Sequence, residues 1–132
     1  MSPRPGRVPR PAVPADHFGI VCALAAVLPG VEESTSYGTP ALKVKGKLFA
    51  RLREDGDTLV VRTTPEDREL LLHTWPHVFY LTDHYRDYPW VLVRLAKIRR
   101  AHLAELLEDA WGRVAPVRLR RQWAAGRAQA GA

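Results

Sequence analysis

Hydrophobic and polar residues alternate along residues 41–53, which predicts two antiparallel strands joined at Gly46. In the first strand, Leu42 and Val44 lie on one face, while Lys43 and Lys45 lie on the other. In the second strand, the same alternation assigns three residues to the buried face and four to the exposed face, namely Leu48, Ala50 and Leu52 against Lys47, Phe49, Arg51 and Arg53. The pattern therefore predicts a sheet with one apolar face and one cationic face that carries an aromatic ring.

The rest of the sequence predicts helices before and after these strands along the chain. Apolar residues recur at helical spacing over residues 16–28 and again over residues 98–114, and Thr64-Pro65 is typical of the start of a short helix, with Thr64 as its N-cap. Further strands are predicted over residues 31–36, 58–63, 78–81 and 90–95. This order predicts an α+β fold, an antiparallel sheet with helices packed on one face.

The length of 132 residues suits one compact domain. We expect residues 16–123 to form it, after a disordered arm over residues 1–15, which contain five prolines, and before an Ala/Gly-rich tail over residues 124–132. The single Cys22 excludes an intramolecular disulfide. No apolar run approaches the roughly 20 residues that span a membrane. We therefore expect a cytoplasmic protein without membrane contact, either a monomer or a weak dimer, whose protein partners the sequence does not identify.

The net charge of +6 comes from the two ends of the chain. Seven of the 20 Lys and Arg residues lie in residues 1–15 and 118–132, which contain no acidic residue. The segment between them carries 13 basic and 14 acidic residues and is close to neutral. The high pI therefore does not by itself indicate a basic globular domain, although basic ends can bind phosphates without sequence preference.

Several segments carry a family resemblance. These are Leu28-Pro29-Gly30, residues 37–50 (YGTPALKVKGKLFA), residues 84–95 (HYRDYPWVLVRL) and Ala115-Pro116. Together they resemble the YjbR/MmcQ-like family of small bacterial proteins over roughly residues 16–123. The resemblance implies a frataxin-like (CyaY-like) fold and a DNA-binding role. It brings no catalytic motif that can be transferred to residues of this chain.

The first functional hypothesis is DNA binding by the predicted cationic face. Phosphates attract cations, and an exposed ring can stack on an unpaired base, so we expect weak, salt-dependent binding without catalysis. The predicted contact residues are Lys43, Lys45, Lys47, Phe49, Arg51 and Arg53, with phosphate contacts from Arg118, Arg120 and Arg121. An ordinary solvated sheet face would show the same pattern.

The alternative hypothesis is a small adaptor or ligand-binding protein. Aromatic and Arg residues, which are favoured at recognition surfaces, are dense around one turn and one loop. The candidate residues are Tyr37, Tyr85, Arg86, Tyr88 and Trp90. The same rings could instead pack the sheet edge onto the helices.

The sequence favours neither metal binding nor catalysis. His73 and His77 have the spacing of two helical metal ligands, but Pro76 lies between them and no acid or thiol completes the set. The frataxin-like resemblance implies iron handling, which depends on a row of acidic residues along a helix. The first predicted helix carries a single acidic residue, Asp16, so the sequence does not favour this role. No nucleophile motif or phosphate-binding glycine loop is present. We therefore expect no cofactor, no metal and no enzymatic activity.

Overall fold

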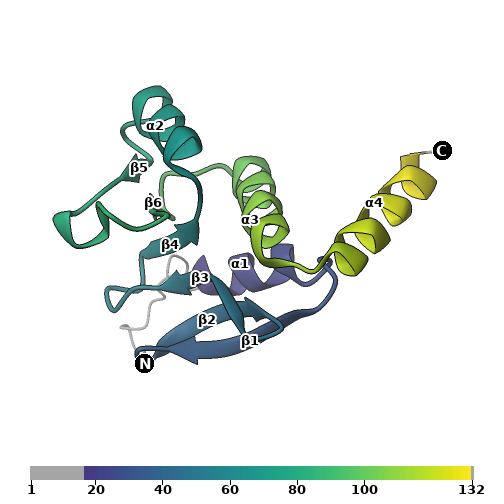
Figure 1. Ribbon diagram of the computed structural model, residues 1–132. Helices are drawn as coiled ribbons and strands as arrows, with labels where there is room; N and C mark the ends of the chain where they lie inside the picture. The colour runs from purple at the N-terminus through teal and green to yellow at the C-terminus, as the bar shows by residue number, and fades with distance from the viewer. Residues whose placement is uncertain (1–16, 132) are drawn as a thin grey trace, which may run out of the picture.

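The computed structural model describes residues 17–131 and has an antiparallel six-stranded sheet with the strand order β1-β2-β3-β4-β6-β5 (Figure 1). In chain order the elements are α1 (His17–Ala25), β1 (Val31–Ser36), β2 (Thr39–Val44), β3 (Lys47–Leu52), β4 (Thr58–Arg62), α2 (Pro65–Thr74), β5 (Phe79–Tyr80), the 3-10 helix η3 (Asp83–Tyr85), β6 (Trp90–Arg94), α3 (Arg100–Val114) and α4 (Val117–Gly131). The predicted α+β class with an antiparallel sheet is confirmed. The likeness to the frataxin fold stays a prediction, and the arm over residues 1–15 lies outside the described residues.

Two-residue turns join the first three strands. Tyr37 and Gly38 connect β1 to β2 with φ of 52° and 79°, and Lys45 and Gly46 connect β2 to β3 with φ of 51° and 78°. Two successive positive φ values give the turn whose twist matches that of the flanking strands. A tyrosine in the left-handed region costs on the order of 1 kcal/mol or more, so the fold holds Tyr37 in place against a local preference.

The helix boundaries follow local chemistry. The Thr64 hydroxyl accepts a hydrogen bond from the Asp67 backbone N–H at 3.2 Å, which confirms the predicted cap of α2. Helix α4 runs to Gly131, so the residues expected to form an Ala/Gly-rich tail continue the last helix instead. Among the helices described, none is both long and apolar enough to cross a bilayer.

The hydrophobic core lies between one face of the sheet and helices α1 and α3. Leu59 and Val61 of β4 and Val91 and Val93 of β6 point into it, together with the buried side of α3. The indole N–H of Trp111 donates to the Pro29 carbonyl at 2.8 Å, which ties α3 to the turn before β1. The helices therefore leave the opposite sheet face to be covered by loops (Figure 1).

A β-bulge in β3 contradicts the predicted alternation. Leu42 of β2 is paired with Ala50, but the next residue, Lys43, is paired with Leu48, so Phe49 has no partner on β2. The extra residue lets Phe49 and Ala50 both enter the core, and Leu48 moves to the other face. Phe49 is 0% exposed. The prediction that its ring lies on the exposed face is therefore wrong, as is the prediction that Leu48 lies on the core face.

The turn between β3 and β4 is fixed by Asp55. Its carboxylate accepts hydrogen bonds from the backbone N–H groups of Asp57 and Thr58, at 2.8 and 3.0 Å, and from the Thr58 hydroxyl at 3.0 Å. Burial alone would raise the pKa of Asp55, but these hydrogen bonds and the nearby Arg53 outweigh burial and lower it. A charged side chain therefore holds the turn between β3 and β4.

Candidate functional site

The sheet face opposite α1 and α3 carries a pocket of about 570 Å³, which we call the tyrosine pocket. Its floor comes from β3, β4 and β6, and its walls come from the β1–β2 turn and from η3 with the loop that follows it. The lining residues are Tyr37, Leu48, Arg51, Glu54, Val60, His84, Tyr85, Tyr88 and Trp90.

Arg51 is the charged group in the floor of the tyrosine pocket. Arg51 is only 8% exposed, and its guanidinium donates to the Thr39 hydroxyl at 2.8 Å and to the Tyr85 hydroxyl at 3.0 Å. The carboxylate paired with it is Glu54 at 3.8 Å, whose side chain is 68% exposed. A guanidinium this buried normally needs a close and equally buried counter-charge. Neutral hydroxyls and a solvated carboxylate meet that need only in part.

The rings above Arg51 remain accessible. Tyr37 is 88% exposed and Tyr88 is 57% exposed. The Arg51 guanidinium lies 5.5 Å from the centre of the Tyr37 ring, which is a cation–π distance. Trp90 lies under a second cation, because the Arg62 guanidinium is 5.6 Å from its ring centre. The pocket therefore combines exposed ring surfaces with a buried positive charge.

Arg68 of α2 positions the wall that carries the tyrosines. Its guanidinium donates to backbone carbonyls of four residues in one loop, at distances of 2.7 to 3.3 Å: Tyr85, Arg86, Tyr88 and Trp90. One charged side chain thus ties four carbonyls of this loop to α2. The loop is fixed from the helix side, and the rings point over the sheet.

The structure brings together most of the residues predicted for a ligand or partner site. Tyr37, Tyr85, Tyr88 and Trp90 all line the tyrosine pocket. Arg86 does not, because its side chain is exposed and pairs with Asp83 one turn earlier. The hydrogen bond from Arg86 to Asp83 raises the pKa of Arg86 above its usual value. The aromatic cluster is therefore a real pocket, and Arg51 rather than Arg86 supplies its cation.

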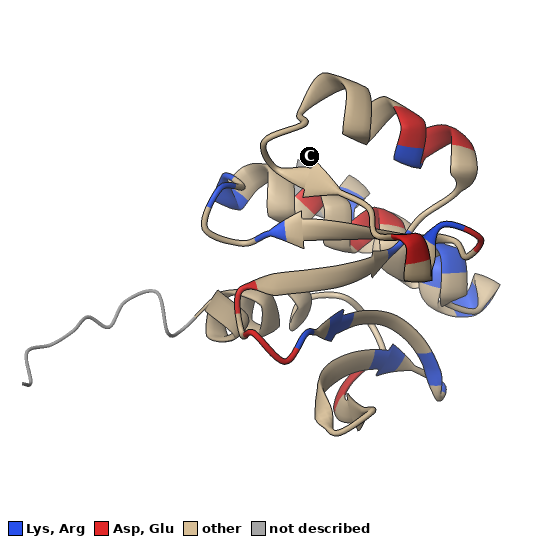
Figure 2. Cartoon of the chain, turned by 90° about the vertical axis from the view of Figure 1, so that its left-hand side faces the viewer, with Lys and Arg blue, Asp and Glu red and all other residues tan. Residues whose placement is uncertain are grey.

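The predicted cationic face is not a single surface. Phe49 is in the core, Arg51 is buried under the tyrosines, and Lys43 is half-buried opposite Glu32 of β1. Lys47 is paired with Val44, a core residue, so it lies on the helix side of the sheet at the hairpin end. Figure 2 shows Lys and Arg spread over several strands and helices, with Asp and Glu between them. The prediction of one face that holds all these cations is therefore wrong.

A smaller group of the predicted cations does remain exposed in one region. Leu119 of α4 and Val44 of β2 both lie against Gly30, so the first turns of α4 are beside the β2–β3 turn. We call the exposed cations of this region the basic end: Lys45, Lys47, Arg118, Arg120 and Arg121. Within residues 17–131, none of them forms an ion pair. Arg53 belongs to the other end of β3, next to Asp55.

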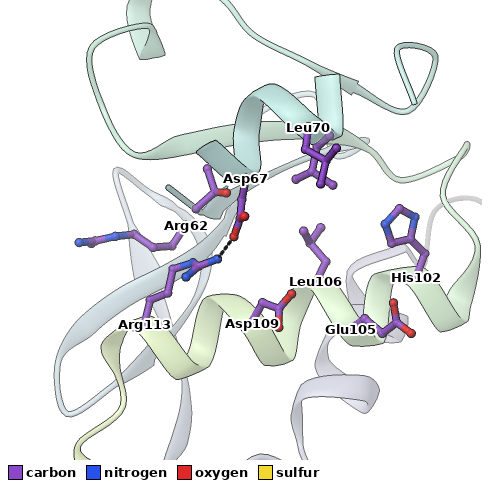
Figure 3. Close-up of a pocket in the computed structure, with 10 residues that line it drawn as sticks. Arg62, Asp67, Leu70, His102, Glu105, Leu106, Asp109 and Arg113 are labelled. Atoms are coloured by element: carbon purple, nitrogen blue, oxygen red, sulfur yellow. Dashed lines mark hydrogen bonds and ion pairs between the residues drawn. The ribbon is translucent and has the colours of Figure 1, made fainter. Parts of the chain in front are cut away.

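A second hollow lies between α2 and α3 (Figure 3). Leu70 and Leu106 face each other across it, and an ion pair joins Asp67 to Arg113. Burial raises the pKa of Asp109, although Arg113 opposes this effect. The hollow encloses about 170 Å³, below the roughly 300–1,000 Å³ typical of ligand sites. We therefore treat it as a packing gap between two helices and not as a candidate site.

Sequence reasoning missed two sets of charged residues. Arg68 lies among Glu66, Asp67 and Glu69 and has the sequence context of a solvated helix face, although it holds the pocket loop. The segment over residues 94–100 contains four cations and no acid, a local signal that the near-neutral charge of the whole domain hides; these are Arg94, Lys97, Arg99 and Arg100. Within residues 17–131, no group of three or more His, Cys, Asp or Glu side chains has an arrangement that could hold a metal ion.

One family model matches the chain over more than half of its length. The family model described as YjbR matches residues 26–113. Uncharacterised proteins from Mycobacterium tuberculosis (strain H37Rv) and Mycobacterium bovis are each 42% identical over 65 residues, covering 48% of this chain and 50% of theirs. The chain thus spans about half the length of these curated relatives. The crystal structure of Deinococcus radiodurans protein DR2400, a DUF419 domain, matches with a TM-score of 0.63 and 23% identity over 75% of this chain and 78% of that one, which shows a shared fold.

Proposed function

The chain belongs to the YjbR family, and we propose that it is a binding protein whose tyrosine pocket takes a small ligand with a flat ring and an anionic group, without a chemical step. The observation that carries this proposal is Arg51, a guanidinium at the floor of the pocket that lacks a buried carboxylate partner among residues 17–131. An anion placed there would complete a charge-assisted hydrogen bond away from bulk water. The pocket walls add ring surfaces for stacking.

The size and shape of the tyrosine pocket support a small-molecule ligand. Its volume of about 570 Å³ falls in the range of known ligand sites, roughly 300–1,000 Å³. Tyr37 is held in the left-handed region and is still 88% exposed, so the fold bears a backbone cost for a ring that packs little surface. A ring serving only to pack the sheet edge would be buried.

A matched pair of probes tests the proposal. Benzoate and benzamide have the same ring and nearly the same shape, but only benzoate is charged. We expect benzoate to shift the Trp90 indole N–H signal in NMR spectra and to bind about tenfold or more tightly than benzamide, because a hydrogen bond between charged groups contributes about 1.5–3 kcal/mol. Arg51→Met should abolish this preference, and Arg51→Lys should keep part of it.

Arg62→Gln is the control for Arg51→Met. Arg62 lies over the Trp90 ring, as Arg51 lies over the Tyr37 ring, but Arg62 does not line the tyrosine pocket, so its replacement should leave the preference for benzoate unchanged. The Trp111 indole N–H, which donates to Pro29 in the core, reports whether each variant is folded. Equal binding of the two probes, or equal behaviour of the Arg51 and Arg62 variants, would contradict the proposal.

DNA binding through the basic end is the second candidate function. Its support is the exposed group of cations on the β2–β3 turn and α4, together with the implication of the family resemblance. Binding of this kind would be weak and set by phosphate neutralisation, because Phe49 is buried and leaves the basic end without the predicted stacking ring. We therefore propose the phosphate contacts predicted from the sequence without the predicted stacking contact of Phe49.

Salt dependence tests the DNA hypothesis. For a labelled DNA duplex, log affinity decreases with log salt. We expect the magnitude of this negative slope to decrease by about 0.9 for each phosphate that a variant no longer neutralises. Lys45→Gln with Lys47→Gln, and Arg118→Gln with Arg121→Gln, should each reduce the slope in fluorescence anisotropy titrations. Arg62→Gln with Arg94→Gln removes two cations elsewhere and should not. Slopes that are the same in all three variants would remove the basic end as a DNA-binding surface.

A further inference from the structure

A third hollow, separate from the tyrosine pocket, lies where α2 meets the start of α3. It encloses about 440 Å³, and we call it the Trp75 pocket. Three short segments form it: the end of α2 with the link to β5, the link from β6 to α3, and the first turn of α3. The lining residues are Trp75, His77, Val78, Lys97, Ile98, Arg99 and His102.

The rings in the Trp75 pocket are fixed by the core beneath them. The Trp75 and His102 rings have centroids 4.5 Å apart, and His102 meets the buried Phe79 ring edge-on at 5.5 Å. Trp75 also caps α2, its backbone N–H donating to the Leu71 carbonyl. A flat ligand group would therefore meet a preformed aromatic wall that loses little conformational freedom on binding.

The charge of the Trp75 pocket is positive. Lys97 and Arg99 contribute full charges, His77 and His102 contribute ring nitrogens, and none of the lining residues is acidic. In the described part of the chain, neither Lys97 nor Arg99 forms an ion pair. Arg94 fixes the same region, with its guanidinium 4.2 Å from the Tyr80 ring centre and a hydrogen bond to the His77 carbonyl.

The start of α3 adds to this positive character. The N-cap residue is Arg99, its side chain makes no capping hydrogen bond within residues 17–131, and the first turn contains no acid. Cations near the positive end of a helix dipole are unfavourable. An anion bound in the Trp75 pocket would relieve part of this cost, so the helix end supports a site that the side chains and the cavity define.

We infer that the Trp75 pocket binds the terminal phosphate of a nucleotide, with the nucleotide base against Trp75 and the phosphate between Lys97 and Arg99. Phosphate is the anion that two adjacent cations and ring nitrogens suit best, since it accepts several charge-assisted hydrogen bonds at once. The ring wall requires a flat group next to that phosphate, and a nucleotide offers both. This inference is independent of the tyrosine pocket, because the two hollows share no residue.

The experiment uses adenosine monophosphate, adenosine and inorganic phosphate as probes. Adenosine monophosphate is expected to shift the Trp75 indole N–H signal, and adenosine, which lacks the phosphate, should bind about tenfold or more weakly. Lys97→Gln with Arg99→Gln should weaken the binding of adenosine monophosphate by a similar factor. Arg118→Gln with Arg121→Gln is the control of equal charge, and Arg51→Met separates this site from the tyrosine pocket; neither should change it.

Each outcome of this experiment supports or overturns the inference. An unshifted Trp75 signal, or equal affinity in the Lys97/Arg99 variant and its control, overturns it. Inorganic phosphate that binds as tightly as adenosine monophosphate overturns the role of the ring wall. A short 5′-phosphorylated DNA strand and the same strand without the phosphate then identify the source. Tighter binding of the phosphorylated strand than of adenosine monophosphate points to a strand end, and weaker binding points to a free nucleotide.

Discussion

Phe49→Ala is expected to lower the free energy of unfolding by about 3–5 kcal/mol, the range for removing a buried aromatic side chain. The ring is 0% exposed and belongs to the cluster between the sheet and α3. Its removal leaves a cavity that the neighbouring strands cannot close, because the sheet hydrogen bonds fix the backbone. Urea unfolding followed by circular dichroism measures the change.

Leu48→Ala is the matched control, one residue earlier on the same strand. Leu48 is half-buried at the tyrosine pocket, so its truncation should cost only about 1 kcal/mol. Strict alternation along β3 predicts the reverse order, with Leu48 in the core and Phe49 exposed. If Leu48→Ala proved more destabilising than Phe49→Ala, β3 would lack the bulge, and the cationic face predicted from the sequence would be restored.

The bulge explains where sequence reasoning succeeded and where it failed. Alternation correctly placed Leu42 and Val44 in the core, and it also placed Ala50 and Leu52 on the core side. The bulge adds one residue between Leu48 and Ala50. Each side chain that precedes it on β3 therefore lies on the opposite sheet face from the one that alternation predicts. The sequence contains no glycine or other marker at this point. Because Leu48 and Phe49 are both apolar, either register would bury an apolar residue, and the pattern could not decide between them.

The candidate site was predictable in its rings but not in its charge. Tyr37, Tyr88 and Trp90 stand out because rings are dense in a turn and a loop. The strand order brings these segments together, because β6 pairs with β4 and Trp90 lies beside Arg62. The role of Arg51 depends on the loop above it, because that loop brings the Tyr85 hydroxyl within hydrogen-bond distance of the guanidinium. The role of Arg68 depends on carbonyls 17 to 22 residues away, which no local pattern reveals.

Gly30→Ala is expected to destabilise the fold by about 2–5 kcal/mol, from two separate causes. Gly30 has φ of 76°, and a left-handed conformation costs a residue with a Cβ roughly 1–2 kcal/mol. The added Cβ would also come within 2.7 Å of a Leu119 methyl group and 3.6 Å of Val44. Overpacking of this kind costs about 1–3 kcal/mol. Denaturant unfolding gives the total, and NMR signals of Trp123, which packs against Trp111, report displacement of α4.

Gly38→Ala separates the two causes. Gly38 has φ of 79°, almost the same as Gly30, but no atom lies within 4 Å of an added Cβ, so only the backbone cost should appear. Combining Gly30→Ala with Leu119→Ala removes the clash, so the double variant should lose less stability than the two single changes added together. If Gly30→Ala and Gly38→Ala proved equally destabilising, α4 would not be packed against the β2–β3 hairpin. In that case Lys45 and Lys47 would not share a surface with the arginines of α4, and the basic end would divide into two weak patches.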